Sequence, residues 1–206
     1  MPFGRELLVI VSAYLLGCVA AGYYLVRLRL GRDVRGLGSG NVGARNVGRV
    51  MGAPGFLVTL GVDFFKGAVA VWLAKESGID AWAVTATMLA VVVGHIWPVQ
   101  LQFRGGKGIA TSIGAVLAFH NGIALVLALV FAAAWMLARN LTIAGLLAFA
   151  VTPLVVFLLG FPLGNVFGLS SLALLILVAH RKNIREELDR AIAADRVKAA
   201  KRAVSK

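Results

Sequence analysis

The sequence predicts an all-α integral membrane protein with about seven transmembrane helices. Of its 206 residues, 60% are hydrophobic and only 15% are charged, whereas soluble domains average about 45 to 50% apolar and about 25% charged residues. The mean hydropathy is +0.88, and the apolar residues form seven runs with short polar, glycine or proline breaks between them. We therefore expect one polytopic membrane domain over residues 1–180 and a basic cytoplasmic tail over residues 181–206.

Each apolar run is taken as one helical segment, because about 20 apolar residues in a helix cross a hydrocarbon layer of about 30 Å. The runs extend over residues 7–29, 54–75, 79–98, 109–120, 122–138, 141–160 and 165–180. Turn residues separate the later runs at positions 121–122, 139–140 and 160–164. Because the fourth run is short, it can also be a re-entrant segment or a half-helix, and a five-span arrangement with re-entrant pieces stays open.

The first run is interpreted as a retained helix. Small residues at positions 19–21 would suit a cleaved signal peptide, but such a peptide carries its positive charges before the apolar core, and here the basic cluster follows it. Cys18 in this run is the one cysteine of the chain, so no intramolecular disulfide is expected.

The basic residues predict the orientation. If the runs cross in sequence, every Lys and Arg except Arg5, Lys66 and Lys75 falls on one side. Because Lys and Arg collect on the cytoplasmic side of membranes, we expect the N-terminus outside and the C-terminus in the cytoplasm. The net charge of +12 is thereby explained without nucleic acid, whose binding would need aromatic residues among the basic ones. The tail is either a helix on the anionic inner leaflet or a solvated segment.

Residues 38–49 form the first polar stretch, with the sequence Gly-Ser-Gly-Asn-Val-Gly-Ala-Arg-Asn-Val-Gly-Arg. Glycines let the backbone turn its N–H groups inward, serine and asparagine donate hydrogen bonds, and arginines bind phosphate as planar forks. The stretch predicts an anion-binding cradle, with a plain glycine-rich turn as the structural alternative. A dinucleotide-binding fold is not expected, because a membrane segment and not a β-strand precedes the glycines. The candidate ligand-binding residues are Ser39, Asn41, Gly43, Arg45, Asn46 and Arg49.

A second stretch, residues 94–108, ends in glycines and cations directly before an apolar run. Backbone donors at the start of a helix favour an anion. The stretch does not match the P-loop pattern, because Gly108 stands where Ser or Thr would hold Mg²⁺. A positive-inside loop is the alternative, and His95 is either a packed interfacial histidine or part of the site. The candidates are His95, Arg104, Gly105, Gly106, Lys107 and Gly108.

Two pairs of polar residues lie three positions apart, and each pair shares a helical face. Asp63 and Lys66 lie within an apolar run, where isolated charges are unfavourable, so they should pair inside the bundle. The pair is either structural, or Lys66 reaches a substrate phosphate. His180 and Asn183 end the last run and can project to the same cytoplasmic mouth, where a histidine accepts a proton or orients a hydroxyl.

Other chemistries are not expected. The sequence has no clustered His, Cys and carboxylate set for a metal, no G-x-S-x-G elbow, and no H-x-x-x-x-D pattern of the soluble-type glycerolipid acyltransferases. A transporter of phosphorylated solutes is the alternative from another class, but no paired repeats of the kind common in transporters are visible. We expect no metal and no cofactor.

Together these stretches resemble the signatures of the bacterial acyl-phosphate-dependent glycerol-3-phosphate acyltransferases of the PlsY type. The matching motifs are residues 38–49, 62–67, 94–98, 103–111 and 180–184. The resemblance implies transfer of a fatty acyl group from acyl phosphate to the 1-hydroxyl of glycerol 3-phosphate, giving lysophosphatidate and phosphate, as the first step of phospholipid synthesis. It also implies a bacterial membrane enzyme whose site faces the cytoplasm, and a functional link to the enzyme that makes acyl phosphate.

The resemblance also implies roles for individual residues. Ser39 and Arg49 fall on the essential pair of the family, the second-stretch glycines fall on its glycerol-phosphate loop, and His180 and Asn183 fall on its C-terminal pair. We expect Arg49, Lys107 and the glycine N–H groups to hold phosphates, and catalysis to consist largely of positioning and charge stabilisation. Ser39 is expected to donate a hydrogen bond, because no residue in the sequence is evident as its base.

The chain departs from the family pattern at two places. Arg45 stands where the family usually has threonine, which adds a cation beside the cradle. Residues 186–188, Glu-Glu-Leu, replace a basic residue and a later glycine and glutamate. A different phosphorylated acceptor is therefore an alternative for this chain.

Overall fold

The computed structural model describes residues 2–187, 189, 190, 192 and 193, and the secondary structure of these residues is entirely helical. The α-helices are α1 (Pro2–Gly17), α2 (Ala21–Leu30), α3 (Ala44–Glu76), α4 (Ala81–Ile96), α5 (Ile109–Phe119), α6 (Asn121–Ala138), α7 (Leu141–Leu158) and α8 (Leu163–Ala179). Two short 3₁₀ turns, η1 (Val34–Gly36) and η2 (Val99–Leu101), lie in the loops. Most of the predicted tail lies outside the described residues.

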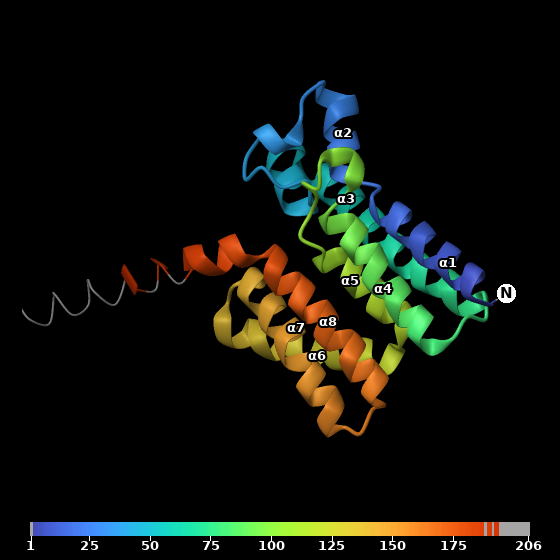
Figure 1. Cartoon of the computed structure of the whole chain (residues 1–206). Helices are drawn as coiled ribbons and strands as arrows, with labels where there is room; N and C mark the ends of the chain where they lie inside the picture. Colours follow the sequence, from blue (N-terminus) through green and yellow to red (C-terminus); the bar gives the residue numbers. More distant parts are fainter. Residues whose placement is uncertain (1, 188, 191, 194–206) are drawn as a thin grey trace, which may run out of the picture.

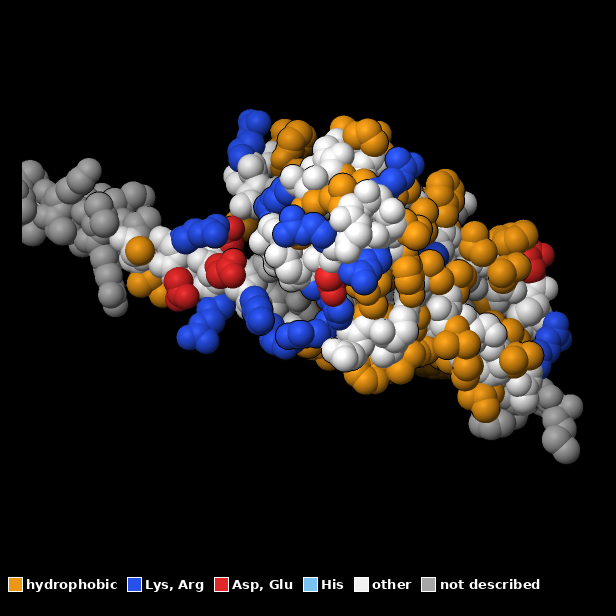
Figure 2. Space-filling model, turned by 90° about the horizontal axis from the view of Figure 1, so that it is seen from above, with side chains coloured by type: hydrophobic (Ala, Val, Ile, Leu, Met, Phe, Trp, Pro, Cys, Tyr) orange, Lys and Arg blue, Asp and Glu red, His pale blue; other side chains and the backbone are white. Residues whose placement is uncertain are grey.

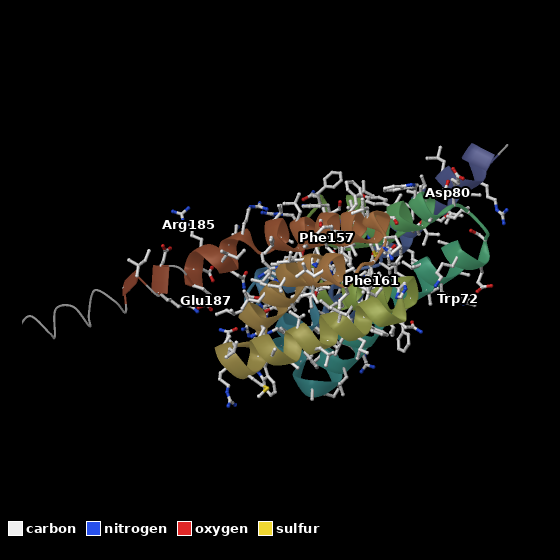
Figure 3. All side chains as sticks on the ribbon, turned by 90° about the horizontal axis from the view of Figure 1, so that it is seen from below. Trp72, Asp80, Phe157, Phe161, Arg185 and Glu187 are labelled. Carbon is white, nitrogen blue, oxygen red and sulfur yellow. The ribbon has the colours of Figure 1, made fainter. Side chains whose placement is uncertain are left out.

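The helices form two groups that pack side by side (Figure 1). Helices α1, α3, α4 and α5 form one group, α6, α7 and α8 form the other, and the contacts of α4 with α8 and of α5 with α6 join them. Helix α2 and the loop after it extend from one end of the bundle. Arg185 and Glu187 lie toward one end of the molecule, and Trp72 and Asp80 lie at the opposite end (Figure 3).

The predicted fold class, an all-helical integral membrane protein, is confirmed. Among the described residues, five segments are long and apolar enough to span a membrane, and a sixth is obtained if α8 is counted with Arg181–Glu187, from which it is bent by 65°. Large apolar side chains on α6, such as Leu125, Met136 and Leu137, are exposed, as expected for a helix that faces lipid. Helix α5, with 11 residues, is the short segment that hydropathy singled out. The count of seven spans and the orientation stay predictions.

The first apolar run is not one helix, contrary to the prediction. It breaks at residues 18–20 between α1 and α2. Hydropathy could not show the break, because Cys18, Val19 and Ala20 are as apolar as their neighbours. The freed carbonyl oxygens accept hydrogen bonds from distant side chains: Val19 O from Lys66 Nζ at 2.8 Å, and Cys18 O from Gln100 Nε2. Such compensation is required where a backbone inside the membrane is not helical.

Helix α3 begins ten residues before the second predicted run and takes in the end of the first polar stretch. It has 33 residues and a kink at Gly52, whose φ of 74° and ψ of −168° lie outside the helical region. This combination of φ and ψ is open to glycine alone, and the kink accommodates Pro54, which cannot donate a helical hydrogen bond. The kink places the polar segment before Gly52 and the apolar segment after it in different directions.

The later breaks agree with the prediction. Arg139 adopts a left-handed conformation, and the Asn140 side chain caps α7 by accepting hydrogen bonds from the N–H groups of Thr142 and Ile143. Gly160 has a φ of 77°, and α8 begins after Pro162. His120 separates α5 from α6.

In two helix pairs, each helix has a glycine at the crossing that lies against the backbone of the other helix. A Cβ atom on Gly67 of α3 would overlap the carbonyl oxygen of Thr111 on α5, and one on Gly114 of α5 would overlap that of Phe64 on α3. Gly17 on α1 and Gly94 on α4 have the same relationship. Small residues at a crossing let backbones approach closely, which is how helices gain packing energy in lipid.

We expect Gly67→Ala to destabilise the protein by about 1 to 3 kcal/mol, because the added methyl group overpacks the α3–α5 crossing. The control is Gly61→Ala on the same helix, where a Cβ atom meets nothing within 4 Å, and where alanine should leave stability unchanged or raise it slightly. Thermal unfolding of the purified variants in detergent measures both. Equal midpoints for the two variants would contradict the role of the crossing.

Candidate active site

The first loop (residues 31–43) is shaped by Asn46. This side chain is buried, its amide nitrogen donates to the carbonyl oxygens of Leu37 and Asn41 at 2.9 Å each, and its Oδ1 accepts the N–H of Ser39 at 2.7 Å. The Oδ1 of Asn41 accepts the N–H of Gly43, the N-cap residue of α3, at 2.8 Å. Asn46 and the Asn41 carboxamide oxygen therefore hold the loop in shape. This differs from the expectation that they contact substrate.

Arg35, which is paired with Asp33 in the first loop, fastens that loop to the second loop (residues 97–108) by a hydrogen bond. The Arg35 guanidinium binds Asp33 through two nitrogens, with an Nη2–Oδ2 distance of 2.7 Å, and its Nη1 donates to the carbonyl oxygen of Leu101 at 2.9 Å. This arginine holds the pKa of Asp33 below its usual range. The sequence carries no signal for the Arg35–Leu101 contact, which joins residues 66 positions apart.

The second loop uses two of its predicted anion donors internally. The N–H of Gly105 donates to Ile96 O at 3.1 Å, and the N–H of Gly106 donates to His95 O at 3.0 Å. These two N–H groups, which were expected to bind phosphate, therefore have partners within the protein. Within the described chain, no partner is found for the N–H groups of Lys107 and Gly108, which lead into α5. The open donors of the loop lie at this helix N-terminus.

Lys107, Asn183 and His180 come together at the entrance to α5. Lys107 Nζ donates to Asn183 Oδ1, across a sequence separation of 76 residues. His180 is buried and its Nδ1 lies 2.9 Å from Ile176 O. Because a carbonyl oxygen can only accept, Nδ1 carries the hydrogen, and a neutral imidazole then has Nε2 free as an acceptor. Asn183 reaches Lys107 from the segment that bends away after α8.

Several charges act on Lys107. Its half-buried position lowers its pKa, the carboxylate of Glu186 opposes this shift, and the positive charges of Arg45, Arg49 and Lys182 lower the pKa further. A lysine among other cations favours an anionic ligand, because the ligand relieves the repulsion between them. Figure 2 shows many of the Lys and Arg side chains near the end of the molecule from which the C-terminal segment leaves.

The two arginines of the first polar stretch line an open cavity of about 410 Å³ on the N-terminal part of α3. Its lining residues are Arg45, Gly48, Arg49, Gly52, Ala53 and Phe56. The Arg45 guanidinium donates to Thr142 Oγ1 on α7, and the Arg49 guanidinium has no protein partner among the described residues. The cavity is therefore lined by two arginines before the kink at Gly52 and by the apolar residues Ala53 and Phe56 after it.

The remaining candidates are divided between surface and interior. Ser39 and Arg104 are exposed on the two loops. Lys66 and His95 are buried, and Lys66 Nζ lies 2.8 Å from His95 Nδ1 and 2.9 Å from Asp63 Oδ1. The expected Asp63–Lys66 pair is therefore present, and its partners are inside the protein. The contacts of Lys66 and His95 do not support the expectation that they bind substrate directly.

Two neighbours of the site were missed from the sequence. Thr142 binds Arg45, and its place in the first turn of α7 follows from the Asn140 cap, which was a visible signal for a helix start. The carboxylate of Glu186 acts on the charge of Lys107. The sequence showed Glu186 as a departure from the family motif and did not place it at the site. Neither contact is local in sequence, so only the folded chain shows it.

Comparison with known proteins places these features in a family. The family model described as glycerol-3-phosphate acyltransferase matches residues 7–190. Glycerol-3-phosphate acyltransferase 1 of Desulfitobacterium hafniense (strain Y51) is 44% identical over 185 residues, which cover 90% of this chain and 92% of the relative. Glycerol-3-phosphate acyltransferase of Aquifex aeolicus (strain VF5) is 38% identical over 185 residues, covering 89% and 96%.

Solved structures agree with these relatives. The crystal structure of PlsY (YgiH), an integral membrane glycerol 3-phosphate acyltransferase, in its glycerol 3-phosphate form superimposes with a TM-score of 0.81 at 38% identity, over 89% of this chain and 92% of that one. The lysophosphatidic acid form gives a TM-score of 0.79 at 37% identity, with the same coverage. The chain therefore belongs to the glycerol-3-phosphate acyltransferase family of integral membrane enzymes.

Proposed function

We propose that this enzyme acylates the 1-hydroxyl of glycerol 3-phosphate with acyl phosphate as the donor, giving lysophosphatidate and phosphate. The observation that carries the proposal is the meeting of Lys107, Asn183 and His180, from two distant parts of the chain, within the electrostatic reach of Arg45 and Arg49. Two phosphate-bearing substrates need such a concentration of positive charge. Relatives named as glycerol-3-phosphate acyltransferases support the acceptor.

The arginine cavity suits the donor. Arg49, which has no partner in the described part of the chain, and Arg45 would hold the phosphate of acyl phosphate as planar forks. Ala53 and Phe56 would contact the first carbons of the acyl chain on the way to the membrane. Phosphate is already a good leaving group, so the donor needs no activation by coenzyme A, metal or cofactor.

The second loop and the C-terminal pair suit the acceptor. Lys107 and the open N–H groups that lead into α5 would bind the phosphate of glycerol 3-phosphate, and His180 Nε2 would accept a hydrogen bond from its 1-hydroxyl. The hydroxyl oxygen then attacks the acyl carbon, and the bond between that carbon and the phosphate oxygen breaks. The hydroxyl proton ends on the departing phosphate, and His180 orients or relays it.

Ser39 is assigned a supporting role at the phosphate. Its side chain is exposed on the first loop, and within the described residues no histidine or carboxylate hydrogen-bonds to it. A serine nucleophile would need such a base. We infer that Ser39 donates a hydrogen bond to a substrate phosphate, and that no acyl-enzyme forms during turnover.

The orientation of the site follows from the charges. Because the cationic loops lie on the side that the positive-inside tendency assigns to the cytoplasm, the active site would face the cytoplasm of a bacterial cell. Glycerol 3-phosphate would enter from water and the acyl chain from the bilayer. The enzyme that makes acyl phosphate would supply the donor at the same membrane face.

The donor is tested first. In purified protein, phosphate release from palmitoyl phosphate should depend on glycerol 3-phosphate and be accompanied by lysophosphatidate, and palmitoyl-CoA should give no product. Arg49→Ala should reduce kcat/KM by about 100-fold or more, because it removes charge stabilisation at the reacting phosphate. Arg29→Ala, an exposed cation at the end of α2, is the control and should keep full activity. Product from palmitoyl-CoA, or full turnover by Arg49→Ala, would contradict the proposal.

Arg45 is expected to strengthen substrate binding in this chain. Replacing it with the usual family residue, as Arg45→Thr, should raise the KM of one phosphate substrate about tenfold and change kcat little, since it removes one charge-assisted hydrogen bond. Thr142→Val removes the protein partner of Arg45 and keeps the cation, so its KM should stay near the wild-type value. Steady-state kinetics with each substrate varied in turn distinguish the two variants. If both lose activity equally, Arg45 acts only by bracing α3 against α7.

We expect the deprotonation of Lys107 to set the alkaline limit of activity. Lys107 binds phosphate when protonated, and because its pKa is lowered from 10.5, kcat/KM should fall as the pH rises through a value below 10.5. Lys107→Arg should move this fall to higher pH. Glu186→Gln should move it to lower pH, because the carboxylate raises the pKa of Lys107. A profile that neither substitution shifts would exclude Lys107 as the titrating group.

A further inference from the structure

Three ionisable side chains, Asp63, Lys66 and His95, lie buried inside the membrane-spanning segments with no part in the reaction described above. Their exposed fractions are 3%, 5% and 5%. Asp63 and Lys66 belong to α3 and His95 to α4, and His95 Nδ1 is 3.4 Å from Asp63 Oδ1. Burying such groups is unfavourable unless they are fully paired. Their presence therefore calls for a function that apolar residues could not supply.

The hydrogen bonds of Lys66 leave no proton for a substrate. Its ammonium group has three donors, and the three acceptors are Val19 O at 2.8 Å, Asp63 Oδ1 at 2.9 Å and His95 Nδ1 at 2.8 Å. Because the ammonium group can only donate, His95 Nδ1 is the acceptor, and the ring hydrogen of the neutral imidazole is on Nε2. Lys66 thus joins α3 to α4 and to the break between α1 and α2.

On one side, Lys66 reaches the second loop through His95. The carbonyl oxygen of His95 accepts the N–H of Gly106, and its ring lies against the same residue, so that a Cβ atom on Gly106 would overlap Nε2. Gly106 directly precedes Lys107 in the chain. A change in the position of the His95 ring would therefore move the backbone that carries Lys107.

On the other side, Lys66 reaches the first loop through Val19. The Lys66–Val19 hydrogen bond holds the break from which α2 starts. Helix α2 packs on α3, and Gly22 in its first turn lies so close to Val42 of the first loop that a Cβ atom would overlap the Val42 carbonyl oxygen. The position of the first loop, and of the α3 segment that begins at its end, thus depends on the same ammonium group.

We propose that Lys66 is a positioning residue that sets the relative placement of the two phosphate-binding loops, through His95 on one side and Val19 on the other. It holds Lys107 in register with Arg49 without touching either substrate. This inference rests on the proposed function of the two loops. It assigns to the buried Asp63–Lys66–His95 network a part in substrate alignment beyond the stability of the bundle.

The test compares two lysines of α3 that both bond to carbonyl oxygens. Lys66→Met keeps the length of the side chain and removes its donors. Lys75→Met is the matched control, because Lys75 Nζ donates to Ala118 O and lies at the far end of the helix. Lys66→Met should lower kcat/KM about 100-fold, as a misalignment of about 1 Å does, and weaken glycerol 3-phosphate binding in a detergent binding assay. Lys75→Met should keep both values.

A double-mutant cycle separates positioning from plain stability. If Lys66 acts by aligning Lys107, the loss of glycerol 3-phosphate affinity in the variant Lys66→Met/Lys107→Met should be clearly smaller than the product of the two single losses. Losses that multiply, or a folded Lys66→Met with wild-type affinity, would overturn the proposal. The binding assay contains no acyl donor, so its result does not depend on whether acyl phosphate is the true donor. If acyl phosphate is not the donor, the wild-type protein will bind glycerol 3-phosphate but will not turn over with acyl phosphate.

A second variant covers the case in which Lys66→Met does not fold. His95→Asn keeps an acceptor for Lys66 at the position of Nδ1 and removes the part of the ring that lies against Gly106. It should stay monodisperse in detergent, with affinity for glycerol 3-phosphate reduced about tenfold or more. Wild-type affinity in this folded variant would overturn the proposed link between His95 and the second loop.

Discussion

The hydrocarbon layer offers no hydrogen-bond partners, and the rest of this structure depends on how the chain supplies its own. At several breaks, a side chain from another element satisfies a freed carbonyl group. Lys66 bonds to Val19 O, Arg35 to Leu101 O, and Tyr14 to Trp97 O at 3.0 Å. The Tyr14–Trp97 bond ties the second loop to the bundle, the Arg35–Leu101 bond ties the two loops to each other, and the Lys66–Val19 bond holds the break from which α2 starts. The same hydrogen bonds therefore satisfy backbone carbonyl groups and hold the elements that carry the active site.

The site separates groups that shape it from groups that face ligands. The Asn46 side chain and the His95 carbonyl oxygen bond to loop backbone. Arg49 and the N–H groups of Lys107 and Gly108 have no partner within the described residues, and these are the donors left for phosphate. An enzyme that works by electrostatic positioning needs such a division, because donors that are held in place before the substrate arrives require no rearrangement during the reaction.

Much of the fold could be predicted from the sequence, because hydropathy and turn residues report on membrane helices directly. The breaks at Arg139 and at Gly160 are local features with local signals. The break at Val19 had no such signal, since it is stabilised by Lys66, 47 residues away. The motifs likewise located the site, but residue type alone does not show whether an N–H or an amide is already occupied. For that reason Asn46 and Gly105 were predicted to bind substrate, and the structure shows that their hydrogen-bonding groups have partners inside the protein.

The kink at Gly52 gives the two arginines lever arms of unequal length. The segment of α3 before the kink is a short lever with its pivot at Gly52. At 1.5 Å per residue, Arg49 lies about 4.5 Å from the pivot along the axis and Arg45 about 10 Å, so a given rotation displaces Arg45 roughly twice as far. The far end of this lever is held by Asn46, whose side chain bonds to the backbone of the first loop, and by Arg45, which meets Thr142 on α7. A substitution at position 45 therefore acts through a longer lever arm than a substitution at position 49.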